Sequence, residues 1–175
     1  KGAAVFSSIS LMPADAMGGW RRDVVEQLRK VAPPVVRFPG GCFVSFYNWE
    51  SSVGDREARD PMPSYYWGGL EENDVGLDEF LELSRLVGFE PQICFNMMTS
   101  EPFKARQLVE YLNAPSDVGM GRLRMLNGHS EPYGVKLFEM DNEPCRKWTP
   151  TQYAEQCVRF AEEMRLADPS IELMV

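Results

Sequence analysis

Apolar residues recur with two different periods along this chain. Between residues 20 and 31 they stand at positions 20, 24, 25, 28 and 31, the spacing of one helix face, and prolines at 33 and 34 end the segment. Short apolar runs bounded by turn residues are typical of buried strands instead. These patterns predict helices at 20–31, 77–87, 102–112 and 151–166, and strands at 3–11, 35–38, 91–96, 136–140 and 171–175.

The predicted strands and helices alternate, which indicates a parallel sheet with helical crossovers. No G-x-G-x-x-G follows a predicted strand and no P-loop is present, so nothing supports a dinucleotide-binding fold. A (β/α)8 barrel needs roughly 250 residues, whereas this chain has 175. Its α/β pattern, about five parallel strands alternating with four helices, therefore fits either a smaller open domain or the front portion of a barrel.

Residues 39–73 follow neither period. This stretch is rich in aromatic residues, among them Trp49, Tyr65 and Trp67, and it includes the glycine pair at 68 and 69. Disordered segments are poor in aromatic residues, and a long loop inside a compact domain is usually functional. We therefore expect residues 39–73 to form a substrate-facing loop.

One apolar run ends in a cluster of polar residues. Residues 135–140 read V-K-L-F-E-M, and Asp141, Asn142, Glu143 and Pro144 follow directly. In barrels of alternating strands and helices, catalysis takes place at the carboxyl ends of the strands. The alternative is a turn that Asp141 and Asn142 cap while Glu143 is solvated. Spacing alone leaves both interpretations open.

Composition narrows the class of partner. The net charge of −8 argues against nucleic acid or an anionic membrane, and no apolar run is long enough to span a membrane. The four cysteines form no C-x-x-C pair and His129 is the single histidine, so we expect neither a metal site nor a cofactor. The chain begins with Lys1, which favours a trimmed or internal piece of a longer protein, and the compartment stays open.

Five segments carry a family resemblance when they are taken together. They are R-F-P-G-G-C-F-V-S-F-Y-N-W at 37–49, G-L-E-E-N-D-V-G-L-D-E-F at 69–80, V-E-Y-L-N at 109–113, N-G-H-S-E-P-Y-G-V-K at 127–136 and D-N-E-P at 141–144. In this order and spacing they resemble the catalytic barrel of the α-L-arabinofuranosidases of glycoside hydrolase family 51. The resemblance implies that residues 1–175 are the N-terminal portion of a TIM-barrel catalytic domain whose later strands are absent.

The resemblance also implies an activity. Members of this family are retaining glycosidases that release terminal α-L-arabinofuranosyl residues from arabinose-containing polysaccharides such as arabinan and arabinoxylan. Their general acid/base falls on Glu143, and the preceding Asn142 is expected to hydrogen-bond the 2-hydroxyl of the sugar. Retention needs two carboxyl groups about 5–5.5 Å apart. The acid must also stay protonated, through partial burial or through the charge of the second carboxylate.

Four further positions match the substrate pocket of the family. Arg37 and Cys42 match residues that line the arabinose pocket, Trp67 matches a tryptophan on the leaving-group side, and Asn96 matches an asparagine that ends the third strand. The first three have structural alternatives: Arg37 pairs with a carboxylate across the barrel, Cys42 is a small buried residue, and Trp67 anchors its loop. A flat aromatic side chain such as Trp67 offers a stacking surface to a sugar face.

The sequence also departs from the family. Asp141 stands where the family usually has glycine, which adds a carboxylate that either raises the proton affinity of Glu143 or points away from it. Residues 53–63 lack the proline that usually follows the glycine of this segment. By resemblance, the nucleophilic glutamate belongs to a later strand and another pocket glutamate lies upstream of Lys1. We therefore expect the 175 residues alone not to turn over substrate.

Two other functions remain open at this stage. One is a related retaining glycosidase of the same barrel type that acts on a glucan or a xylan. The other is a non-catalytic sugar-binding module, which a strand-end glutamate beyond Val175 in the parent protein would argue against. The expected partner is an arabinose-containing oligosaccharide or polysaccharide, and the resemblance implies a homo-oligomer for the full-length protein.

Overall fold

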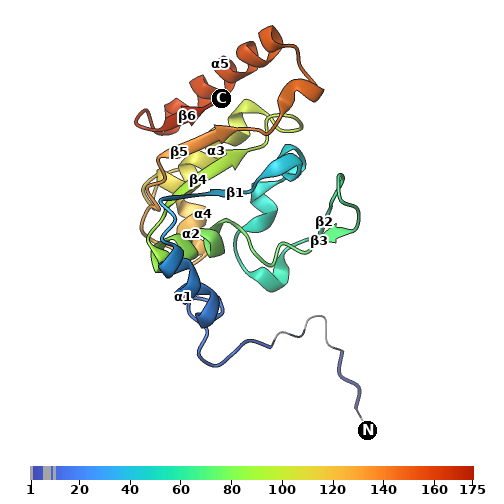
Figure 1. Cartoon of the computed structure of the whole chain (residues 1–175), viewed down its shortest axis with the longest axis vertical. Helices are drawn as coiled ribbons and strands as arrows, with labels where there is room; N and C mark the ends of the chain where they lie inside the picture. Colours follow the sequence, from blue (N-terminus) through green and yellow to red (C-terminus); the bar gives the residue numbers. More distant parts are fainter. Residues whose placement is uncertain (1, 6–8, 10) are drawn as a thin grey trace.

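The computed structural model describes residues 2–5, 9 and 11–175 and contains a four-stranded parallel sheet (Figure 1). The strands lie side by side in the order β1 (Val35–Phe38), β4 (Glu90–Phe95), β5 (Leu137–Met140) and β6 (Glu172–Met174). Phe38 pairs in register with Ile93, and Ile93 pairs with Phe138. Because all four strands run in the same direction, the carboxyl ends of β1, β4 and β5 lie along one edge, called the carboxyl edge below.

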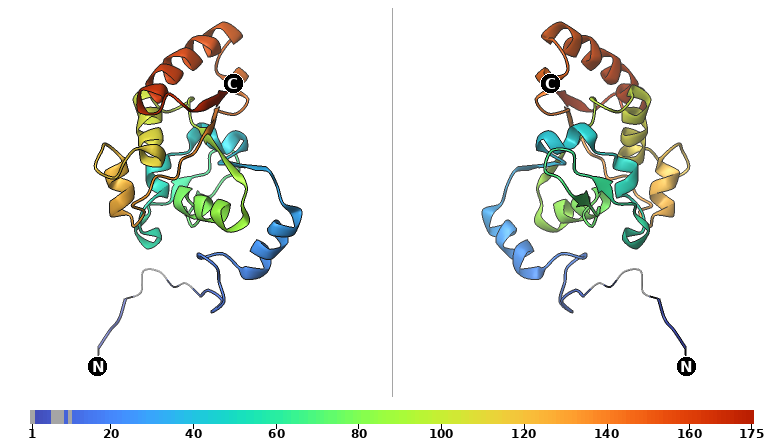
Figure 2. Two further views of the ribbon diagram at one scale, coloured as in Figure 1. Left: turned by 90° about the vertical axis from the view of Figure 1, so that its left-hand side faces the viewer. Right: turned by 90° about the vertical axis from the view of Figure 1, so that its right-hand side faces the viewer.

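Helices pack against one face of this sheet. Phe38 of β1 stacks on Phe80 with ring centroids 4.9 Å apart, and Phe95 of β4 contacts Phe160 at 5.8 Å. Within the described residues, α3 packs along α5, and α1 packs against α2 (Figure 2). The helices are α1 (Arg22–Val31), α2 (Leu77–Val87), α3 (Pro102–Asn113), α4 (Gly121–Leu126) and α5 (Pro150–Ala167).

Local sequence explains where two of these helices begin and end. The Thr149 hydroxyl accepts a hydrogen bond from the Gln152 amide, and the Gln152 side chain accepts one from the Thr149 amide, so the pair caps the start of α5. Helix α2 ends at Gly88, whose φ of 94° lies in the left-handed region that glycine adopts without steric penalty.

Side chains alternate between the two faces of the sheet. Ile93 and Phe138 face the helices and are fully buried. Arg37, Gln92 and Glu139 occupy the opposite parity, and Arg37 pairs in register with Gln92. The second face therefore carries polar and charged side chains, while the first face forms the hydrophobic core.

Residues 39–73 are ordered through short elements. Figure 1 shows this segment on the side of the sheet toward which β4 and β5 point. Arg59 attaches the segment to α2, because its guanidinium donates to the Glu79 carboxylate at 2.8 Å and to the Asn73 carbonyl at 2.8 Å. The elements are the 3₁₀ helices η1 (Gly41–Phe46), η2 (Trp49–Ser52) and η3 (Arg56–Ala58), and the hairpin strands β2 (Met62–Pro63) and β3 (Leu70–Glu71).

All four predicted helices and four of the five predicted strands are confirmed. The exception is the strand expected at 3–11: residues 3–5, 9 and 11 lie in no strand, and the rest of that range is outside the described residues. The sheet therefore has four described strands where the apolar pattern predicts five. Among the described residues, no helix has both the length and the apolar character needed to cross a membrane.

Candidate active site

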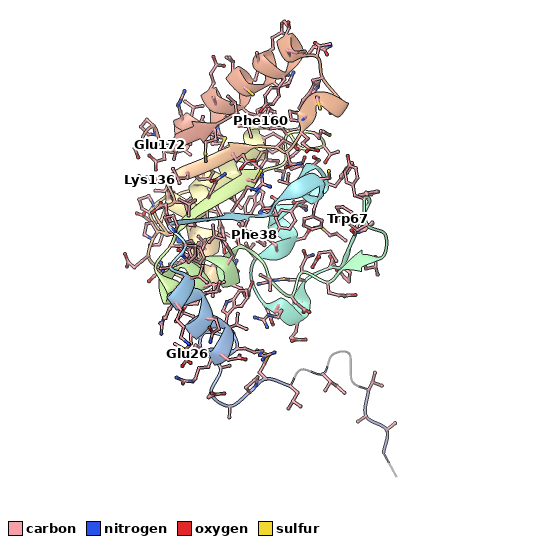
Figure 3. The ribbon with its side chains drawn as sticks, in the orientation of Figure 1. Glu26, Phe38, Trp67, Lys136, Phe160 and Glu172 are labelled. Atoms are coloured by element: carbon pink, nitrogen blue, oxygen red, sulfur yellow. The ribbon has the colours of Figure 1, made fainter. Side chains whose placement is uncertain are left out.

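The carboxyl edge of the sheet gathers most of the residues selected from the sequence. Figure 3 shows Trp67 on this side of the molecule, whereas Lys136 and Glu172 lie toward the opposite end of the strands. The structure places Arg37 in β1, Cys42 in η1, Trp67 in the turn of the β2–β3 hairpin, Asn96 directly after β4, and Asn142 and Glu143 directly after β5.

Arg37 is held from two directions. Its Nη1 donates to Glu139 Oε1 at 2.5 Å, and both terminal nitrogens reach Asn142 Oδ1 at 3.5 Å. Gly40 allows this position, because a Cβ atom there would lie 3.1 Å from Arg37 Nε. The Glu139 carboxylate also accepts a hydrogen bond from Gln92. Arg37 thus pairs with a carboxylate, as its structural alternative predicted. Through Asn142 it also contacts the candidate catalytic turn.

Asn142 and Glu143 lie in a turn with unusual backbone angles. Asp141 has a φ of 64° and Glu143 a φ of 49°, both in the left-handed region that residues with a side chain rarely adopt. Asn142 is half-buried against Arg37, and Glu143 is exposed. The partial burial that a general acid needs is therefore not supplied by the described residues around Glu143.

The Asp141 side chain points into the protein. It is 2% exposed, and its carboxylate accepts hydrogen bonds from the Ser45 hydroxyl and from the amides of Met97 and Met98. Of the two roles considered for this added carboxylate, the geometry matches the one that points away from Glu143.

The thiols near the site differ in their surroundings. Cys42 is half-buried and free, whereas Cys94 is buried and its Sγ donates to the Asp141 carbonyl at 3.4 Å. Burial, followed by the charge of Glu139, raises the pKa of the Cys94 thiol above its ordinary value, so this thiol is a poor nucleophile. Within the part of the chain that the structure describes, no group of His, Cys, Asp and Glu side chains is arranged to hold a metal ion.

Asn96 uses its amide within the protein. The Nδ2 group donates to the Tyr47 carbonyl at 3.2 Å and to the Thr99 hydroxyl at 2.8 Å, while Oδ1 accepts from the Thr99 amide at 2.9 Å. The residue is 6% exposed. These contacts connect the end of β4 to Tyr47, the residue directly after η1.

Trp67 is 77% exposed at the tip of the β2–β3 hairpin. Two neighbouring tyrosines connect the hairpin to the segment after β1: the ring of Tyr65 lies 4.8 Å from that of Phe46, and the ring of Tyr66 lies 5.6 Å from it. The hairpin therefore has aromatic anchors other than Trp67, and the indole remains open for contact with a ligand.

Comparison with known proteins decides the family. Residues 27–175 match the family model described as "Alpha-L-arabinofuranosidase 1 domain". The chain belongs to this family. It is 39% identical over 168 residues to alpha-L-arabinofuranosidase C of Emericella nidulans, and 37% identical over 161 residues to the intracellular exo-alpha-(1->5)-L-arabinofuranosidase 1 of Bacillus subtilis. These alignments cover 93% and 89% of the chain but 33% and 32% of the relatives, so the chain spans about a third of their length.

Solved structures of the same family share the fold. The GH51 α-L-arabinofuranosidase of Thermotoga petrophila superposes with a TM-score of 0.87 at 34% identity, over 93% of this chain and 35% of that one. The Thermotoga maritima α-L-arabinofuranosidase, in its arabinose complex, gives 0.85 at 35% identity, over 89% and 33%. The resemblance to glycoside hydrolase family 51 and the partial-barrel fold class are thereby confirmed.

Sequence analysis of this arabinofuranosidase-family chain did not select Glu139 or Gln92. Glu139 accepts a hydrogen bond from Arg37 and another from Gln92, and it is the one carboxylate in the strand L-F-E-M. A carboxylate inside an apolar strand indicates a nearby cation or hydrogen-bond donor, because burying such a group without a partner costs free energy. The 102-residue separation between Arg37 and Glu139 hides that partner in the sequence.

Proposed function

We propose that this chain forms the acid/base portion of a retaining α-L-arabinofuranosidase, with Glu143 as the general acid/base. The observation that carries the proposal is the Asn142–Glu143 pair at the carboxyl end of β5, with the Asn142 amide oxygen 3.5 Å from two nitrogens of Arg37. Catalytic groups of parallel barrels come from the ends of several strands, as β5 and β1 contribute here.

In the proposed first step, Glu143 gives its proton to the glycosidic oxygen as the bond between that oxygen and the anomeric carbon breaks. The bonding electron pair goes to the departing oxygen, and a second carboxylate forms the bond to the anomeric carbon. Water then attacks the anomeric carbon as the bond to the second carboxylate breaks; that carboxylate leaves with the bonding electron pair, and Glu143 takes the proton of the water. We place the second carboxylate on a later strand of the full-length enzyme, consistent with relatives about three times as long.

The other selected residues bind the sugar in this proposal. Asn142, oriented by Arg37, donates to the 2-hydroxyl, where hydrogen bonds strengthen in the transition state. Cys42 lines the pocket at the start of η1, and Asn96 supports its wall. Trp67 gives the leaving-group side a flat stacking surface.

The proposed substrate is a terminal α-L-arabinofuranosyl residue on an arabinose-containing oligosaccharide or polysaccharide. Two observations support this class: the Bacillus subtilis relative is named for α-(1->5)-linked arabinofuranosyl groups, and the Thermotoga maritima structure is an arabinose complex. The net charge of −8 suits a neutral substrate better than a nucleic acid or an anionic membrane. A homo-oligomeric full-length enzyme is part of the same proposal, and its mass in solution tests it.

The test compares the full-length enzyme with its Glu143→Ala variant on an aryl α-L-arabinofuranoside. Removal of a general acid lowers kcat/KM by about 10²–10⁴-fold. Added azide restores turnover in Glu143→Ala, because this anion attacks the glycosyl-enzyme without needing a base. The matched control is Glu155→Ala, which removes an exposed carboxylate on α5 and leaves the rate unchanged.

Three outcomes would overturn parts of the proposal. Parent-like activity of Glu143→Ala would exclude this residue as the acid/base. Hydrolysis of glucosides or xylosides in preference to arabinofuranosides would replace the substrate class. Sugar binding without any hydrolysis by the full-length protein would leave a binding module.

A further inference from the structure

Asp141 connects three separate segments of the carboxyl edge. Its Oδ1 accepts from the Ser45 hydroxyl at 2.5 Å and from the Asn142 amide at 2.7 Å. Its Oδ2 accepts from the amides of Met97 at 2.7 Å and Met98 at 2.9 Å. These donors belong to η1, to the turn after β4 and to the turn that bears Glu143. One buried carboxylate is thus shared by the loops that follow all three strands of the site.

The main chain of Asp141 adds to these connections. Its amide donates to the Phe95 carbonyl at 2.9 Å, and its carbonyl accepts from Cys94 Sγ at 3.4 Å. The residue therefore has contacts from both its backbone and its side chain to the end of β4. A neighbouring contact fixes the end of β5: the Tyr153 hydroxyl of α5 donates to the Met140 carbonyl at 3.0 Å.

The strained turn needs such support. Asp141 and Glu143 both hold positive φ angles, of 64° and 49°, and backbone strain of this kind persists only where the surroundings over-determine it. Aspartate is one of the few residue types that tolerates this region. Glu143 lies two residues beyond Asp141. Between them, the side-chain oxygen of Asn142 accepts from both terminal nitrogens of Arg37, and the backbone N–H of Asn142 donates to Asp141.

We propose that Asp141 is a positioning residue: it sets the Asn142–Glu143 turn so that the Glu143 carboxyl is directed at the glycosidic oxygen. The inference rests on the proposed function, because it assumes that Glu143 is the general acid. Asp141 itself does not touch substrate, since its carboxylate is turned into the protein and occupied by four donors. Its effect on the reaction passes through the backbone of the turn.

Asparagine at this position disturbs the anchor in a defined way. An amide has one accepting oxygen and one donating nitrogen, whereas the Asp141 carboxylate accepts at both ends. If the side-chain oxygen of the new asparagine keeps the Met97 and Met98 backbone donors, its NH2 group takes the place of Asp141 Oδ1. That group then faces the backbone N–H of Asn142, which now donates to Oδ1 at 2.7 Å, so two donors oppose each other. Asp141→Asn therefore displaces the very residue that precedes Glu143. Asp141→Gly removes the carboxylate, while glycine adopts the positive φ without strain. This variant therefore measures the loss of the carboxylate without an added backbone strain.

The experiment measures kcat/KM of the full-length enzyme on two aryl α-L-arabinofuranosides. The 2,4-dinitrophenyl group leaves without protonation, whereas the 4-methoxyphenyl group needs the general acid. We expect Asp141→Asn and Asp141→Gly to lower kcat/KM on the 4-methoxyphenyl substrate by about 10- to 100-fold, with a loss at least about tenfold smaller on the dinitrophenyl substrate. Ser45→Ala, which removes a single donor, has a weaker effect in the same direction.

Asp78→Asn is the matched control. Asp78 is 6% exposed in α2 and accepts from the hydroxyls of Tyr111 and Tyr133, so the same chemical change is made at another buried carboxylate. It should not alter the ratio of the two kcat/KM values, whatever it does to the melting temperature. A purely structural role of Asp141 would likewise lower both rates equally.

Glu143→Ala is measured in parallel to separate the two claims. If Glu143→Ala shows the leaving-group dependence and the Asp141 and Ser45 variants show equal losses or none, the positioning role is wrong and the proposed function stands. If Glu143→Ala itself shows no leaving-group dependence, the proposed function fails and the positioning role fails with it. A variant at position 141 that does not fold leaves Ser45→Ala to decide the question by the same ratio.

Discussion

Arg37 is oriented by a carboxylate that does not belong to the proposed catalytic pair. Glu139 accepts from Arg37 at 2.5 Å and also from Gln92, and it lies two residues before Asp141 on β5. A guanidinium that has a carboxylate on one side and the Asn142 amide on the other is restricted to one orientation. Glu139, on the polar face of the sheet, thus helps to fix the guanidinium that contacts the proposed sugar-binding residue Asn142.

Glu139→Gln tests whether the negative charge of Glu139 is needed to orient Arg37. The substitution keeps the size of the side chain but removes the ionic partner of Arg37, and the loss of one hydrogen bond to a charged group is worth about a tenfold change. We expect kcat/KM of the full-length enzyme to fall by about that factor. Glu172→Gln is the control, because Glu172 lies on the same face of the sheet in β6 and is exposed. Wild-type kcat/KM in Glu139→Gln would show that Arg37 needs no ionic partner.

Sequence analysis correctly placed at the carboxyl edge those residues that closely follow a predicted strand. Asn142 and Glu143 are the second and third residues beyond β5, so the strand prediction locates them. The strand prediction does not give the direction in which a side chain points. Asn96 directly follows β4, and its side-chain amide hydrogen-bonds Tyr47 and Thr99. Only the folded path of residues 39–73 brings Tyr47 to this position.

At the scale of elements, α4 is built around a buried arginine. Arg124 is 0% exposed and donates to the carbonyls of Tyr111 and Ala114 at the end of α3, and to those of His129 and Ser130. Burial lowers the pKa of its guanidinium below the ordinary value. The positive charge nevertheless suits this position, because the carbonyl end of a helix carries partial negative charge.

Arg124→Met should therefore destabilise the protein. Methionine fills much of the volume but leaves buried carbonyls without donors, so we expect the free energy of unfolding to fall by about 3–5 kcal/mol. Urea unfolding of the full-length protein followed by circular dichroism measures this. Arg122→Met, at an exposed position of the same helix, should change the free energy by less than about 0.5 kcal/mol. Equal effects at the two positions would contradict the role of Arg124 as a cap.

The periodicity of apolar residues predicts α2 with its observed bounds and α1, α3 and α5 within about two residues of theirs. Residues 39–73 show why the same approach stops there. Their 3₁₀ helices and hairpin are held by distant side chains, such as Arg59 on Glu79, and not by any repeat within the segment. A local pattern carries no information about a contact of that kind.

At the scale of the whole molecule, the described sheet has two open edges, β1 and β6, and one polar face. We expect the 175-residue chain, produced by itself, to hydrolyse an aryl α-L-arabinofuranoside at less than about 10⁻³ of the full-length rate, because a retaining mechanism needs both carboxyl groups. Size-exclusion chromatography of the same sample should show self-association through the open edges. A monomeric chain with full-length activity would refute both expectations.

The long separation between Arg37 and its partners has a consequence for synthesis of the protein. Glu139 follows Arg37 by 102 residues and Asn142 follows it by 105, so neither partner exists when β1 leaves the ribosome. At 5–20 residues per second, the delay is on the order of 5–20 s. During that time Arg37 is an uncompensated positive charge on a short strand, and such a charge discourages pairing with other nascent chains. We therefore expect Arg37, which Glu139 and Asn142 hold in the folded chain, to oppose aggregation of the unfinished sheet during synthesis.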